Sequence, residues 1–228
     1  MSTFAQKILN FYKNLRLKNS ELPQGIEVMN PFFNEKTWTI VEAFYNKFYD
    51  DNQQRKLILG INPGRHGAGL TGIPFTDTKR LNNVCDIPFS EFESHETSSV
   101  FVYDMIHAYG GVAQFYNNFY ISSVSPLGFV KQNKNGRFVN YNYYDNKALE
   151  KALKPFIVDT LKQQLSFGID TNICYCLGTG KNYQYLEKLN AEYSFFQQII
   201  PLEHPRYIMQ YKLKDKQNYI EKFIQLLF

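Results

Sequence analysis

The sequence predicts an α/β protein with a parallel sheet covered by helices on both faces. Two observations carry this prediction. Apolar runs of strand length alternate along the chain with apolar stripes at helical spacing, and the strand-like runs are apolar almost throughout. The 228 residues contain no internal repeat and no linker, so we expect one domain over 1–228, with 1–50 as a helical extension packed on it.

The first part of the chain is expected to supply two helices and the first strand. Apolar residues at helical spacing indicate an amphipathic helix over 3–17, and Pro, Gly and Asn indicate a loop over 22–31. A second helix follows Asn34, which is a candidate N-cap. The first buried strand is 56–61. A long loop then extends to Phe89, and loops of that length in a compact domain are usually functional.

The rest of the chain is expected to alternate between strands and helices. A helix over 98–109 should be closed by Gly110 and Gly111. Pro155 lies inside the apolar stripe of a long helix over 149–165, where it should start a turn or kink the helix. The other expected elements are strands at 119–124, 172–177 and 195–201, a helix after Lys181 and a closing helix at 220–227.

Each predicted strand ends in a polar or Gly/Pro cluster. The first ends at Asn62, the second at Ser123 and the fourth at His204, while the third runs into residues 178–181. Parallel strands place their carboxyl ends at one edge of the sheet, where open α/β sheets bind ligands. We therefore expect four separate segments to meet at one cleft. Taken alone, the stretch 62–75 could equally be an ordinary Gly/Pro turn.

Composition and charge narrow the class of protein. The net charge of +4 permits a polyanionic partner without requiring one. Basic residues are in excess between Lys131 and Lys154, which is either a phosphate-contacting surface or a solvated loop and helix start. No apolar run is as long as a membrane span, and 1–17 lacks the features of a signal peptide. We expect a cytoplasmic protein.

No metal or cofactor is expected. The three cysteines suggest no disulfide framework and are too few for a usual iron–sulfur cluster, and the four histidines lack metal-ligand spacing. Gly180-Lys181 is followed by Asn182, so the phosphate-binding P-loop pattern is not met. The glycines at 67–72 match the letters of a dinucleotide fingerprint, but they lie six residues past the strand and run into Pro74.

The residues GINPG at 60–64, TGIPF at 71–75 and His204-Pro205 resemble the uracil-DNA glycosylase superfamily. The extended pattern looks most like its SMUG branch, the single-strand-selective monofunctional uracil-DNA glycosylases. The resemblance runs from about residue 57 to 206. It implies a three-layer α/β/α fold with a central four-stranded parallel sheet. It also implies hydrolysis of the N-glycosidic bond of a damaged base in DNA, which leaves an abasic site.

The resemblance also implies roles for individual residues. Asn62 would orient the attacking water, because an amide can position water but cannot act as a general base near pH 7. His204 would donate to the base oxygen that becomes anionic, a kind of interaction that is usually the largest catalytic contribution. Phe75 would stack on a base that has left the duplex or lies in a single strand. The remaining base-binding residues would be Ile61, Gly64 and Ser123.

Two departures from the family pattern affect the prediction. Ser123 stands where the SMUG pattern has an asparagine that reads the uracil edge, so we expect a broader substrate range that includes uracil, xanthine and modified uracils. The segment after His204 is shorter than in the family, which leaves Arg206 and Tyr207 as wedge or phosphate-binding residues. Lys181, at a helix start, favours a phosphate partner. Arg65 and Lys79 are either further DNA contacts or solvated cations.

These observations together predict a monofunctional DNA glycosylase with DNA as its partner and no obligate protein partner. The matched motifs contain no lysine, so we expect no Schiff-base step. Two other functions stay open at this point. One is a catalytically silent nucleic-acid-binding module on the same fold, and the other is a hydrolase of free nucleosides or nucleotides. Affinity for DNA should fall steeply with salt, which separates a DNA enzyme from the latter.

Overall fold

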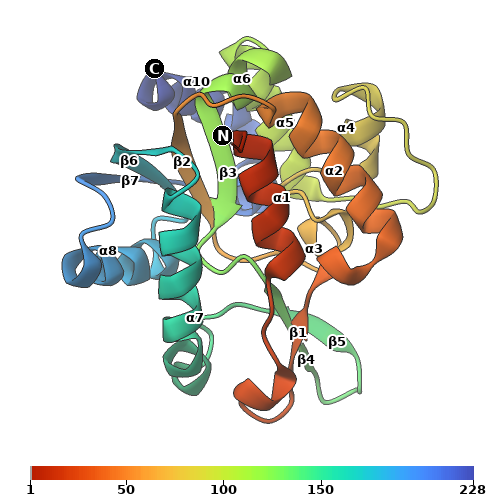
Figure 1. The fold of residues 1–228 in the computed structure, drawn as a ribbon, viewed down its shortest axis with the longest axis vertical. Helices are drawn as coiled ribbons and strands as arrows, with labels where there is room; N and C mark the ends of the chain where they lie inside the picture. The colour runs from red at the N-terminus through yellow and green to blue at the C-terminus, as the bar shows by residue number, and fades with distance from the viewer. Residues whose placement is uncertain (1) are drawn as a thin grey trace.

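A four-stranded parallel sheet forms the centre of the computed structural model, which describes residues 2–228 (Figure 1). The strand order is β3-β2-β6-β7, and every neighbouring pair is parallel. The strands are β2 (Arg55–Gly60), β3 (Phe119–Ser123), β6 (Ile169–Leu177) and β7 (Gln198–Leu202). This confirms the predicted three-layer α/β/α fold.

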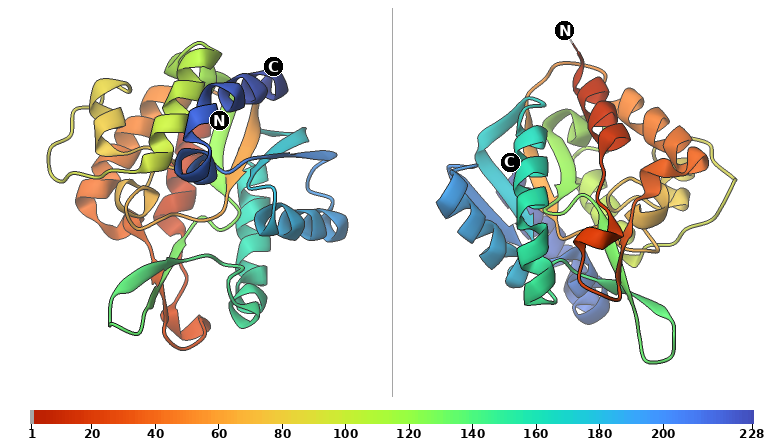
Figure 2. Two further views of the ribbon diagram at one scale, coloured as in Figure 1. Left: turned by 180° about the vertical axis from the view of Figure 1, so that it is seen from behind. Right: turned by 60° about the horizontal axis from the view of Figure 1, so that its bottom comes forward.

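Helices cover both faces of this sheet (Figures 1 and 2). On one face, the ring of Tyr120 in β3 packs edge-on against Phe4 of α1 at 5.6 Å. On the other, the Tyr175 hydroxyl of β6 donates to the Leu226 carbonyl of α10 at 2.9 Å. The longer helices are α1 (Phe4–Asn14), α2 (Glu35–Tyr49), α5 (Thr97–Tyr109), α7 (Lys147–Leu165), α8 (Lys181–Tyr193) and α10 (Lys216–Leu227).

A second sheet was not predicted. Its antiparallel strands have the order β1-β4-β5, and they are β1 (Ile26–Met29), β4 (Gly128–Gln132) and β5 (Phe138–Tyr141). They occupy the expected loop at 22–31 and the start of the basic segment. Four or five residues with partly exposed side chains give too little apolar alternation to indicate a strand. A Cβ at Gly128 would collide with the Pro63 carbonyl, so this sheet approaches the loop after β2.

Several shorter elements also differ from the prediction. The loop at 62–89 contains two short helices, and the first helix is shorter than expected. Helix α7 runs through Pro155 without a break, because Pro155 and Lys151 are exposed and water can satisfy the carbonyl that loses its donor. The remaining elements are α3 (Ala68–Thr71), α4 (Thr78–Asn83), α6 (Val112–Asn118), α9 (Pro205–Tyr211), η1 (Asn19–Glu21), η2 (Pro31–Phe33) and η3 (Leu213–Asp215). Within residues 2–228, no helix has the length and apolar character needed to cross a membrane.

Candidate active site

A cleft of about 470 Å³ lies at the carboxyl edge of the parallel sheet. It is bounded by the ends of β2, β3 and β7, by the loop around Gly67 and by the segment that precedes α5. The structure therefore brings together residues that are far apart in the sequence. The predicted site residues that line the cleft are Ile61, Asn62, Gly64, Phe75, Ser123, His204, Arg206 and Tyr207.

The Asn62 amide is held by the backbone on both its polar atoms. Its Oδ1 accepts a hydrogen bond from the Tyr143 backbone N–H at 3.2 Å. Its Nδ2 donates to the carbonyls of Pro63 at 3.3 Å and Tyr141 at 3.4 Å. The amide therefore has one fixed orientation, and the second lone pair of Oδ1 can still accept from a water molecule.

A buried brace supports this arrangement, and sequence reasoning missed it. The fully buried Tyr143 donates its hydroxyl proton to Asn182 Oδ1 at 2.8 Å. The Asn182 Nδ2 in turn donates to the Leu177 carbonyl at 3.0 Å and the Gly60 carbonyl at 3.4 Å. The segment that fixes Asn62 is thus tied to the tips of two central strands. No local motif marks Tyr143 or Asn182, because their roles depend on contacts between distant segments.

Phe75 has a backbone conformation that is uncommon for a residue other than glycine. Its φ of 54° lies in the left-handed region, which costs on the order of 1–3 kcal/mol. Its ring lies close to Gly60, where an added Cβ would be 3.4 Å from Cζ, and 5.9 Å from the His204 ring. Thr71 Oγ1 donates to the Thr76 carbonyl at 2.8 Å and holds the turn. The structure thus keeps Phe75 against the cleft despite the strain.

His204 is the N-cap of α9 and is neutral at pH 7. Burial, together with the nearby Arg206 guanidinium, lowers the pKa of His204 to about 4. Its Nδ1 accepts a hydrogen bond from the Arg206 backbone N–H at 3.2 Å. In a neutral imidazole the remaining proton must then be on Nε2, which makes that atom a donor. The sequence left open whether His204 is neutral or protonated, and the structure favours the neutral form.

Ser123 and Gly64 line the cleft from different elements. Ser123 ends β3, pairs with Gly60 and is 7% exposed on the cleft. Gly64 faces Asn140 of the second sheet, and Asn140 Oδ1 accepts from the Arg65 backbone N–H at 2.9 Å. The hairpin of β4 and β5 thus reaches the cleft, which Asn140 also lines.

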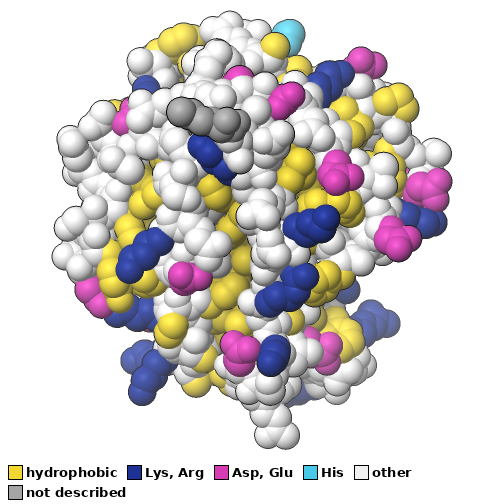
Figure 3. All heavy atoms as spheres, viewed as in Figure 1, with side chains coloured by type: hydrophobic (Ala, Val, Ile, Leu, Met, Phe, Trp, Pro, Cys, Tyr) yellow, Lys and Arg dark blue, Asp and Glu magenta, His cyan; other side chains and the backbone are white. Residues whose placement is uncertain are grey.

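The predicted DNA-contacting residues are spread more widely. Arg206 and Tyr207 line the cleft from the first turn of α9. Lys181 lies in an adjoining cavity of about 280 Å³ that also contacts His204 and Tyr207. Arg65 and Lys79 are exposed and do not line the cleft. On the face shown in Figure 3, Lys and Arg side chains are interspersed with Asp and Glu and form no single patch.

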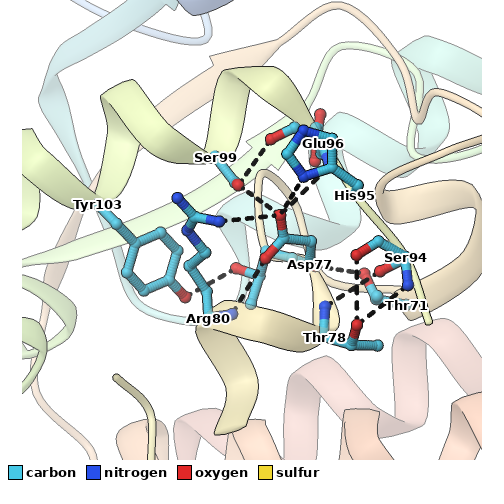
Figure 4. Close-up of polar contacts among 10 residues, drawn as sticks. Thr71, Asp77, Thr78, Arg80, Ser94, His95, Glu96, Ser99 and Tyr103 are labelled. Carbon is cyan, nitrogen blue, oxygen red and sulfur yellow. Dashed lines mark hydrogen bonds and ion pairs between the residues drawn. The ribbon is translucent and has the colours of Figure 1, made fainter. Parts of the chain in front are cut away.

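A buried aspartate, Asp77, holds together the segment before α5, part of which lines the cleft (Figure 4). Asp77 is the N-cap of α4, and its Oδ1 accepts from the Arg80 N–H at 3.0 Å. Its Oδ2 accepts from Ser99 Oγ at 2.8 Å and from the Glu96 N–H at 3.2 Å. The carboxylate also forms an ion pair with Arg80 at 3.3 Å. Asp77 thereby joins α4 to the start of α5.

Glu96 is the other residue that sequence reasoning missed. Its side chain lines the cleft, and its Oε2 is buried with no hydrogen-bond partner among residues 2–228. Burial and the Asp77 carboxylate raise the pKa of Glu96 to about 7, against the opposing effect of Arg206. No spacing or composition in this polar segment distinguishes Glu96 from its exposed neighbours.

In the part of the chain that the structure describes, no group of three or more His, Cys, Asp or Glu side chains could hold a metal ion. The three cysteines are buried and free. Burial raises the pKa values of all three thiols, so none has thiolate character near neutral pH.

Comparison with known proteins agrees with this architecture. A family model described as the uracil DNA glycosylase superfamily matches residues 46–228. The crystal structure of wild-type SMUG2 from Pedobacter heparinus is 58% identical in sequence and has a TM-score of 0.96. The match covers 99% of this chain and 97% of that chain. None of the curated proteins matches this chain.

The chain therefore belongs to the uracil DNA glycosylase superfamily. Within that superfamily it is SMUG-like, and it is a DNA glycosylase, a hydrolase that cleaves N-glycosidic bonds. The family, the fold and the class of enzyme expected from the motifs are confirmed.

Proposed function

We propose that this enzyme is a monofunctional glycosylase that removes uracil and related deaminated or oxidised bases, including xanthine and modified uracils, from DNA. The single observation that best supports the proposal is the fixed Asn62 amide in the same cleft as the Nε2 donor of a neutral His204. These two groups match the two requirements of the reaction, a positioned water and a donor for the departing base.

The reaction can be written from these residues. Asn62 Oδ1 holds a water against the sugar carbon that bears the base. As the carbon–nitrogen bond breaks, its electron pair passes to the base, and His204 Nε2–H donates to the base oxygen that gains negative charge. The hydroxide part of the water joins the sugar, and its proton is transferred to the released base. Stacking on Phe75 contributes roughly 1–3 kcal/mol to holding the extruded base.

The substrate range depends on Ser123. A serine hydroxyl can rotate and either donate or accept, so it discriminates less between base edges than an amide does. We therefore propose that Ser123 admits both uracil and xanthine. Substituting Ser123→Ala should change the relative rates on the two bases, and unchanged rates and preference would rule out this role.

The most direct test uses oligonucleotides that carry one uracil or one xanthine, followed by alkali, which breaks the strand at abasic sites. Wild-type protein should produce strand breaks and Asn62→Ala should not. If wild type breaks no strand, the proposed activity is wrong. If Asn62→Ala still cleaves, the site assignment is wrong. The cleavage rates on single-stranded, mismatched and paired substrates then measure how far Arg206 and Tyr207 allow cleavage of duplex DNA.

The proposal also covers the setting of the enzyme. We propose that residues 1–228 act as one domain in the cytoplasm, associated with the nucleoid, on single-stranded DNA or on bases extruded from a duplex, without an obligate protein partner, metal or cofactor. Because DNA binding releases counterions, the affinity for an oligonucleotide should fall steeply with added salt. Equal affinity at low and high salt would instead favour a hydrolase of free nucleosides.

A further inference from the structure

The Glu96 carboxyl is an unpaired acceptor inside the cleft. Its Oε2 is buried and has no hydrogen-bond partner among the described residues. The backbone of Gly67 lies directly against this oxygen, since an added Cβ there would collide with the carboxyl. Gly67 and its neighbour Ala68 also line the cleft. The carboxyl is therefore enclosed by the same loop that surrounds the predicted position of the base.

The backbone of Glu96 is fixed, which sets the point from which its side chain enters the cleft. The Glu96 N–H donates to the buried Asp77, and the Glu96 carbonyl lies 2.7 Å from Ser99 Oγ, which also contacts Asp77 (Figure 4). The backbone N–H and the backbone carbonyl of Glu96 are thus both held by the group that Asp77 and Ser99 form. Leaving an acceptor unpaired in a buried place is unfavourable. A group from the substrate that supplies a donor would remove that penalty.

The chemistry of DNA limits what this donor can be. Phosphates and deoxyribose rings within a strand offer only acceptor oxygens, whereas N–H donors occur on the bases. The nearby protein cation is Arg206, and no ion pair joins it to Glu96 among residues 2–228. A carboxylate also repels phosphates, so it is poorly suited to hold the strand. Among the groups that a DNA substrate offers, the donor that fits is a base N–H.

We propose that Glu96 is a specificity-determining residue that accepts a hydrogen bond from a ring N–H of the extruded base. This inference rests on the glycosylase function proposed above. The Glu96 carboxyl would discriminate between bases by the number of ring N–H donors that each base offers. Uracil joined to deoxyribose has one ring N–H besides its carbonyls, whereas the neutral form of xanthine has two in its six-membered ring. One donor can be satisfied at Ser123, and the second requires Glu96. Xanthine should therefore depend on Glu96 more than uracil does.

The test measures binding separately from cleavage. Oligonucleotides with 2′-fluoro sugars bearing uracil or xanthine resist hydrolysis, because fluorine disfavours positive charge on the sugar. Glu96→Gln keeps the size of the side chain and removes the charge. It should weaken binding of the xanthine oligonucleotide roughly tenfold to a hundredfold more than that of the uracil one. Glu96→Asp withdraws the carboxylate by one methylene group, and it should likewise weaken binding of the xanthine oligonucleotide more than binding of the uracil one.

Two controls separate base reading from other effects. Glu93→Gln removes an exposed carboxylate from the same segment and should leave the preference unchanged. An oligonucleotide with an abasic site should bind wild type and Glu96→Gln equally. If Glu96→Gln tightens binding of all three oligonucleotides alike, Glu96 only repels phosphates and the inference is wrong. An unchanged preference in both Glu96 variants would also overturn it. Failure of wild type to cleave ordinary uracil or xanthine DNA would refute the proposed function instead.

Discussion

The two sides of the cleft treat their polar groups in opposite ways. On the sheet-edge wall, formed by Asn62, Ser123 and His204, the backbone fixes the groups assigned to chemistry. Both polar atoms of the Asn62 amide are bonded to backbone, and His204 Nδ1 accepts from a backbone N–H. On the loop wall, formed by Gly67 and Glu96, the backbone is fixed, but the Glu96 Oε2 has no hydrogen-bond partner among residues 2–228.

The difference between the two walls matches the part of the proposed substrates that varies, which is the base. A positioned water and a donor for the leaving oxygen are needed for every base, so preorganised groups suit that task. A group that reads the base can gain its partner only when the base arrives. Burial shifts the titration of both walls toward neutral forms, because it lowers the pKa of His204 and raises that of Glu96. At pH 7 His204 is neutral whereas Glu96 is about half ionised, so the two walls differ in charge as well as in their hydrogen-bond partners.

The largest expected effect is on the sheet-edge wall. His204→Ala removes the Nε2 donor and should lower kcat for a uracil oligonucleotide about a hundredfold to a thousandfold. Single-turnover cleavage measures this directly. His107→Ala, which changes an exposed histidine at the end of α5, is the matched control and should cleave at the wild-type rate. A loss of less than tenfold in His204→Ala would mean that other groups stabilise the departing base.

A smaller effect is expected in the brace behind this wall. Tyr143→Phe removes the hydroxyl bonded to Asn182 and loosens the segment that orients Asn62. It should lower kcat roughly tenfold to a hundredfold with little change in KM, because a small misplacement of a positioning group is costly. Loss of the bond should also reduce the free energy of unfolding by about 1–3 kcal/mol.

The control for this brace is Tyr45→Phe. The Tyr45 hydroxyl on α2 is buried without a hydrogen-bond partner among residues 2–228, so its removal should leave kcat unchanged. If Tyr143→Phe lowers the melting temperature but cleaves at the wild-type rate below it, the brace stabilises the fold without positioning Asn62.

The residues of the sheet-edge wall could be predicted from the sequence, whereas Glu96 of the loop wall could not. Asn62, Ser123 and His204 could be placed at one edge because each lies at or just after the end of a buried strand, and parallel strands bring such residues together. The parallel sheet could be predicted as well, because the run of apolar residues within each short segment indicates a buried strand. Ser123 and His204 needed no knowledge of side-chain contacts to be found.

Residues whose roles depend on distant partners could not be predicted in this way. Tyr143 matters because its N–H and hydroxyl meet Asn62 and Asn182, which are 81 and 39 residues away in sequence. Glu96 differs from exposed Glu93 only through burial beside Asp77 and Gly67. The second sheet was missed because its strands are short and have exposed positions, and because β1 pairs with β4 across about a hundred residues, as in Ile26 with Lys131.

The smallest expected effect concerns the stability of the loop wall. The pKa of Glu96 is raised from 4.5 to about 7 in the folded protein, so the folded state binds this proton more tightly than the unfolded chain does. The contribution of Glu96 to wild-type stability should therefore fall as pH rises from about 4.5 to 7, as Glu96 ionises inside the cleft. The lowered pKa of His204 acts in the opposite direction over this range, and the comparison of wild type with a Glu96 variant cancels it. Glu96→Gln cannot ionise and should lack this contribution. Between pH 5 and pH 8 its free energy of unfolding should increase by about 1–2 kcal/mol relative to that of wild type.

Urea unfolding at the two pH values measures the difference, with Glu93→Gln as the control. An equal difference at both pH values would show that the Glu96 carboxyl is as well solvated as an ordinary surface carboxyl, and the contrast between the two walls would then disappear.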